Sequence, residues 1–125
     1  MKKTEIAQQI TLHLNTKEDF LEAWKKGVKL YPKLFRIKTE DGNIDSAKDQ
    51  WDLCPLDEDF WDNEFFNYSR GEKAFLASML SFYNSYRAQI LLKVIGREDI
   101  CSVTSILDSE RKSILVDLIN TYRGW

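Results

Sequence analysis

The sequence predicts an α+β fold that is mainly helical, with a small antiparallel sheet packed against four or five helices. Apolar residues recur at spacings of three and four over several long segments, and two short segments alternate apolar and polar residues instead. The chain has 125 residues, 43% of them hydrophobic, with only five Gly and two Pro. This composition is typical of one globular domain, here residues 1–125, that buries a core without metal or disulfide support.

The first predicted strand covers residues 6–14. Four of its five even positions are apolar, namely Ile6, Ile10, Leu12 and Leu14, while polar residues hold most odd positions. A period of two is typical of a half-buried strand. The alternative is a helix that aligns Ile6, Ile10 and Leu14, but the middling helix propensity of residues 11–13 favours the strand.

The first helix is predicted to begin at Lys17 and to end at Pro32. Thr16 and Asp19 resemble a capping box, with Asp in place of Glu. The helix then carries one apolar stripe, formed by Phe20, Leu21, Trp24, Val28 and Tyr31. Proline stops it because the residue before a proline is pushed away from helical angles.

A short hairpin is predicted next. Residues 35–39 alternate apolar and polar side chains, Asp41 and Gly42 form a turn dipeptide, and residues 43–45 return antiparallel. This hairpin and the N-terminal strand form the predicted sheet.

Helical segments account for most of the remaining chain. The first covers residues 57–67, with acidic residues in its first turn. A second begins after the Ser69 and Glu72 capping box and either continues to Gly96 or breaks at Asn84. The last is capped by Asp108 and covers residues 109–122. The predicted core contains Ile10, Leu12, Leu14, Trp24, Val28, Leu76, Leu80, Ile114 and Leu118.

The charge distribution is uneven although the net charge is only −2. Residues 1–38 carry a net charge of +5, residues 39–69 carry −9, and residues 70–125 carry +2. Between Lys48 and Arg70 lie seven acidic and six aromatic residues and no basic one. Six rings are costly to expose and seven carboxylates are costly to bury, so this segment is expected to surround rings with an acidic rim.

The two cysteines and the N-terminal sequence both favour the cytoplasm. Cys54 and Cys101 are expected to be reduced and mostly buried, because a chain of this size does not need a disulfide. Residues 1–9 lack the apolar stretch of a secretory signal. The longest uncharged run, residues 74–86, is too short and too polar to cross a membrane.

Few residues point to catalysis, and the protein is predicted not to be an enzyme. His13 is the single histidine and falls on the polar face of the first predicted strand. Together with two widely separated cysteines it does not form a zinc-site pattern. The acids of residues 57–64 do not fit an EF-hand, because Trp61 and Asp62 stand at positions where that loop needs an acid and a glycine. No glycine-rich nucleotide loop is present, so no cofactor or metal is predicted.

The leading functional hypothesis is a small cytoplasmic protein that binds a basic protein partner. Aromatic side chains would anchor the interface, and carboxylates would steer the partner toward it. An immunity protein against a toxin, or an inhibitor encoded by a phage or another mobile element, fits this size and charge. The expected partner-binding residues are Trp51, Asp57, Asp59, Phe60, Trp61, Asp62 and Glu64.

The alternative hypothesis is a nucleic-acid-binding accessory protein. It would use cations on and just after the first helix, namely Lys25, Lys26, Lys29 and Lys33. Because the sequence pI is about 5.4, nucleic acid is not expected to be the main ligand.

Overall fold

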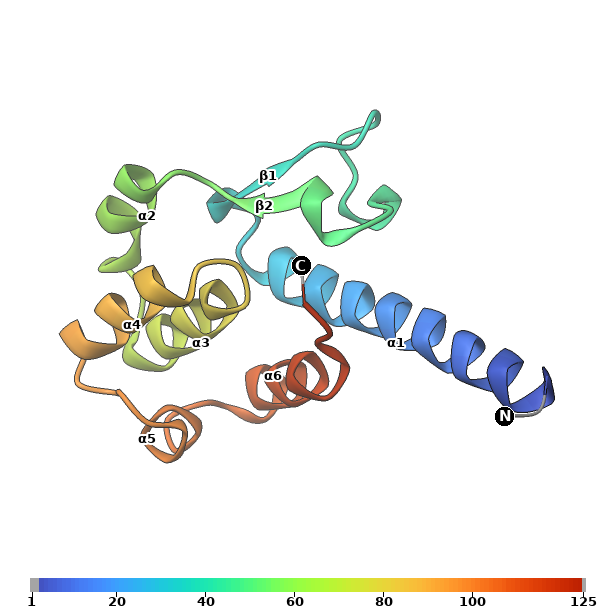
Figure 1. The fold of residues 1–125 in the computed structure, drawn as a ribbon. Helices are drawn as coiled ribbons and strands as arrows, with labels where there is room; N and C mark the ends of the chain where they lie inside the picture. Colours follow the sequence, from blue (N-terminus) through green and yellow to red (C-terminus); the bar gives the residue numbers. More distant parts are fainter. Residues whose placement is uncertain (1–2, 125) are drawn as a thin grey trace.

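In a computed structural model, residues 3–124 form a mainly helical fold with a small two-stranded antiparallel sheet (Figure 1). The structure describes the backbone of residues 3–124 and the side chains of residues 5, 6 and 17–124. The helices are α1 (Lys3–Leu30), α2 (Glu58–Phe65), α3 (Arg70–Ser81), α4 (Ser85–Val94), α5 (Ile100–Thr104) and α6 (Ser109–Thr121). The strands are β1 (Phe35–Ile37) and β2 (Leu53–Pro55), and three short 3-10 turns precede or separate them. The predicted fold class is confirmed.

The predicted N-terminal strand is wrong, because residues 6–14 lie inside α1. Lengthening a formed helix costs far less than starting one, and no Gly or Pro interrupts the sequence before Gly27. The helix predicted from Lys17 therefore extends back to Lys3 and passes through Thr16 without using it as a cap. It ends at Leu30, before Pro32 as predicted. No helix of the described chain is long and apolar enough to cross a membrane.

The predicted hairpin is right in its first strand and wrong in its second. Residues 35–37 form β1, but their partner is β2, with Arg36 opposite Cys54. Residues 44–46 form a 3-10 turn instead, held by Asn43, whose side chain accepts a hydrogen bond from the Asp45 N–H. Short polar side chains compete with strand pairing in this way.

Helices α3 and α6 begin at the caps that the sequence predicts, whereas α2 begins one residue after Asp57, which was expected in its first turn. Asp57, Ser69 and Asp108 cap α2, α3 and α6, and the Ser69 capping box is complete. The long helical segment breaks, because the Asn84 side chain caps a new helix, α4. Helix α5, capped by Asp99, was not predicted.

The core lies between α1, α3 and α6 and extends under the sheet. Two buried indoles fix the sheet to it. Trp24 donates its ring N–H to the Leu53 carbonyl, and Trp61 donates its own to the Leu34 carbonyl, both at 2.9 Å. The Phe35 ring packs edge-on against both indoles. Trp24, Val28, Leu76, Leu80, Ile114 and Leu118 are buried as predicted, whereas the side chains of Ile10, Leu12 and Leu14 lie outside the described residues.

Candidate functional site

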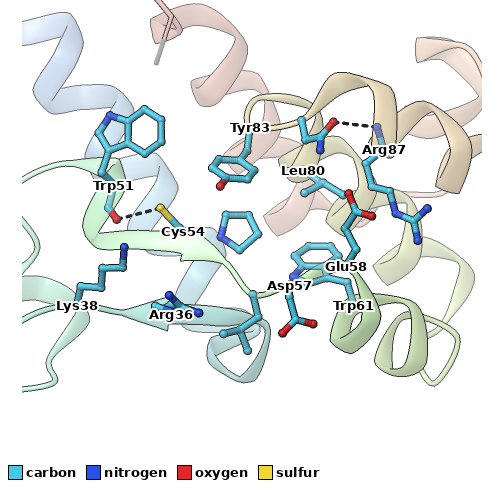
Figure 2. A pocket seen from close by; sticks show the side chains of 13 residues that line it. Arg36, Lys38, Trp51, Cys54, Asp57, Glu58, Trp61, Leu80, Tyr83 and Arg87 are labelled. Atoms are coloured by element: carbon cyan, nitrogen blue, oxygen red, sulfur yellow. Dashed lines mark hydrogen bonds between the residues drawn. The ribbon is translucent and has the colours of Figure 1, made fainter.

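The candidate site is a cleft of about 540 Å³ between the sheet, the start of α2 and the junction of α3 with α4 (Figure 2). Its walls combine three aromatic rings, a thiol, three cations and two carboxylates. These groups belong to Trp51, Trp61, Tyr83, Cys54, Arg36, Lys38, Arg87, Asp57 and Glu58. A cavity of this size that brings several polar groups together is the usual form of a ligand site.

The alternation of β1 explains why cations line the cleft. Phe35 and Ile37 face the core, so Arg36 points to the opposite face of the two-stranded sheet, as does Lys38, the residue directly after β1. Arg36 stands directly opposite Cys54, which places their side chains on the same face. That face forms one wall of the cleft.

Of the three expected aromatic anchors, one lies on the surface and the other two are buried or partly buried. Trp51 is 48% exposed, and its ring meets that of Tyr83 with centroids 6.2 Å apart. Trp61 is only 2% exposed and Phe60 is partly buried against the core. Trp51 is therefore the expected anchor whose ring is open to a partner.

The expected acidic residues all lie on or just before α2, but three of them have partners within the chain. Asp57 caps α2 by accepting from the Phe60 N–H, Asp62 pairs with Arg87, and Glu64 pairs with Lys33. The hydrogen bond from Lys33 to Glu64 raises the pKa of the lysine. Asp59 is exposed in the first turn of α2.

Three of the four lysines in the alternative hypothesis contact carboxylates or a backbone oxygen. Lys25 is buried and donates to Glu22 and to the Asp45 carbonyl. Lys29 pairs with the Asp45 carboxylate at 2.6 Å, and Lys33 pairs with Glu64 at 2.9 Å. These contacts reduce the positive charge that α1 offers to a phosphate.

Sequence reasoning assigned no role at this site to Tyr83, Arg87 or Arg36. Tyr83 and Arg87 flank the break between α3 and α4, so only that break brings them to the cleft. Arg36 reaches it through the pairing of β1 with β2, which has no local signature. The side chain of His13 lies outside the described residues.

Cys54 is a buried thiol in the cleft wall and donates a hydrogen bond to the Trp51 carbonyl at 3.0 Å (Figure 2). Burial raises its pKa above the ordinary thiol value, although Lys38 and Arg36 act in the opposite direction. Cys101 lies on α5 and is exposed, which corrects the prediction that both thiols are buried. Neither cysteine forms a disulfide.

Iodoacetamide is expected to modify Cys101 first and Cys54 at a rate at least about tenfold lower, because the reaction needs an accessible thiolate. Peptide mass spectrometry over time would measure both rates in the folded protein. The Cys101→Ser variant should retain only the slow reaction. Equal rates at the two thiols would contradict the buried position of Cys54.

Comparisons with known proteins give no relative: no family model, curated protein or solved structure matches this chain. Within the described residues, no group of three or more His, Cys, Asp or Glu side chains is placed to hold a metal ion. The site is therefore interpreted from its own geometry.

Proposed function

We propose that this protein is a non-catalytic cytoplasmic protein that binds a basic protein partner at the α2 side of the cleft. The observation that carries the proposal is the meeting of exposed carboxylates with exposed rings. Glu58 and Asp59 are exposed in the first turn of α2, and Glu58 lines the same cleft as Trp51 and Tyr83. Interfaces commonly combine such aromatic anchors with a charged rim.

Helix α4, whose Arg87 lines the cleft, carries further exposed apolar side chains. Tyr86, Ile90 and Val94 follow one another at intervals of four residues on α4 and are 74%, 36% and 60% exposed. This spacing places them on one face of the helix. Exposed apolar side chains grouped beside charged ones are typical of protein interfaces.

The charge of residues 39–69, −9, supports a basic partner. Carboxylates that steer a cationic protein raise its association rate. A basic nuclease toxin held by an immunity protein, or a basic host protein held by an inhibitor from a mobile element, has the required chemistry. Burial raises the pKa of Cys54, which keeps the thiol lining the cleft in its less nucleophilic form.

Charge reversal of Glu58 and Asp59 to lysine is expected to slow association with the partner about tenfold or more at low salt. These two residues are better targets than Asp57 and Asp62, because reversing the latter would also remove a helix cap and an ion pair. The matched control reverses Glu110 and Asp117, two exposed acids on α6. Both double variants change the net charge equally.

The partner would first be captured by crosslinking in the producing cells, with each variant as bait. Association rates with the purified partner would then be measured at low and high salt. The proposal expects the wild type and the α6 control to agree and the α2 variant to lose rate and salt dependence. A partner that binds both variants with the same rate would contradict it.

A further inference from the structure

Two of the three cations in the cleft lie at its sheet end. Arg36 and Lys38 extend from the sheet, whereas Asp57, Glu58 and Arg87 lie toward α2 and α4 (Figure 2). Neither Arg36 nor Lys38 forms an ion pair within the part of the chain that the structure describes. The sheet end therefore offers two cations that form no ion pair among the described residues, although Lys38 also lines a neighbouring hollow with Glu40, Asp41 and Asp52.

Two aromatic rings beside these cations are partly exposed. Trp51 and Tyr83 are 48% and 43% exposed and meet at an interplanar angle of 70°. Two rings at this angle form a corner in which a third planar ring can stack on one face and meet the edge of the other. Proteins that bind single-stranded nucleic acid combine aromatic rings, on which the bases stack, with cations that contact the phosphates.

We propose that the cleft binds a nucleoside monophosphate, with the phosphate at Arg36 and Lys38 and the base against Trp51 and Tyr83. The cleft volume of about 540 Å³ is within the range of small-molecule sites. The carboxylates fit this ligand when its base carries an exocyclic amine, because Glu58 can accept an N–H from adenine. Asp57 is already occupied as the cap of α2.

This inference shares Trp51, Tyr83 and Glu58 with the proposed protein interface, but it rests on Arg36 and Lys38, which that interface does not use. The 5′-phosphorylated end of a single strand carries the same chemistry as a free nucleotide. Four probes separate these sources and the parts of the ligand: AMP, adenosine, inorganic phosphate and a short 5′-phosphorylated oligodeoxyadenylate.

Binding would be measured by calorimetry and by quenching of Trp51 emission, with Trp51→Phe identifying the part of the signal that comes from this ring. AMP is expected to bind more tightly than adenosine or phosphate alone. Arg36→Ala and Lys38→Ala are each expected to weaken AMP binding about tenfold, the size of a lost charge-assisted hydrogen bond. Both side chains are exposed, so thermal unfolding should be unchanged. Lys26→Ala, an exposed cation on α1, is the matched control and should bind AMP like the wild type.

The inference would be wrong if AMP did not bind at concentrations up to about 5 mM, or if AMP and inorganic phosphate bound with equal affinity. It would also be wrong if Arg36→Ala and Lys38→Ala both left the affinity for AMP unchanged. Tighter binding of the oligonucleotide than of AMP would support the same site and identify a strand end as the source. Loss of AMP binding leaves the Glu58 and Asp59 experiment unaffected, so the two proposals can fail separately.

Discussion

Replacing Trp61 with alanine is expected to lower the free energy of unfolding by about 3–5 kcal/mol. The side chain is 2% exposed and packs against the Phe35 ring, with centroids 5.9 Å apart. Its removal leaves a cavity where α2 meets the sheet. The Leu34 carbonyl keeps a hydrogen bond from the Leu56 N–H, so most of the loss comes from packing.

Urea denaturation followed by circular dichroism would measure this change. Trp61→Phe keeps most of the ring area and loses the indole hydrogen bond, so about 1–2 kcal/mol is expected. Phe66→Ala is the control, because that ring follows the same helix and is 52% exposed, and its loss should cost about 1 kcal/mol or less. A Trp61→Ala variant that unfolds like the wild type but loses its partner would show instead that the indole belongs to the interface.

Local chemistry predicted the starts of α3 and α6, each of which depends on one capping side chain, but the same signal at Asp99, which caps α5, was missed. Ser69 and Asp108 each accept a backbone N–H at the start of a helix, as the sequence predicted, whereas Asp57 was expected inside the first turn of α2 and instead caps it. Pro32 likewise ended the first helix where the sequence placed its end. Such interactions join residues two or three positions apart, so their residue types suffice to recognise them.

Pairing between distant residues was harder to predict. The apolar residues of the segment 6–14 fit both a period of two and a helical spacing. The segment is helical because the helix that follows it extends through it. The strand over residues 35–37 was recognised from its alternation, but its partner lies beyond two intervening 3-10 turns. A hairpin rule finds only the nearest partner, and β2 is too short to show an alternation of its own.

For the candidate site too, residues within one segment of the sequence could be predicted, but residues brought in by tertiary packing could not. Trp51, Asp57 and Trp61 were singled out from composition, and the structure places all three along one cleft. Composition could not separate the exposed ring of Trp51 from the buried ring of Trp61, because both lie in the same acidic segment. The cations of β1 and the ring of Tyr83 reach the cleft through tertiary packing, which no local pattern records.

A second large loss of stability is expected when Arg111 is replaced with alanine, about 2–3 kcal/mol at neutral pH. This side chain joins three helical regions. Its Nε donates to the Tyr31 hydroxyl at 2.6 Å, and its guanidinium lies 3.8 Å from the Glu72 carboxylate and pairs with Asp108. Burial raises the pKa of Tyr31 to about 12, so the phenol stays neutral and donates to Glu72 in turn. Without Arg111 a partly buried carboxylate loses its cation.

The pH dependence of this loss tests its cause. Burial acts to raise the pKa of Glu72, but hydrogen bonds from Ser69 and Tyr31 and the charge of Arg111 hold it below the usual value. A carboxyl with a lowered pKa stabilises the folded state above its unfolded pKa, about 4.3, and loses that contribution as the pH falls through its folded pKa. The wild type and Arg111→Ala should therefore differ most near pH 7 and converge in acid. Lys112→Ala, an exposed neighbour on α6, should show no such difference at either pH. A gap of constant size from pH 7 to pH 3 would mean that Arg111 stabilises the fold by packing and not through its charge.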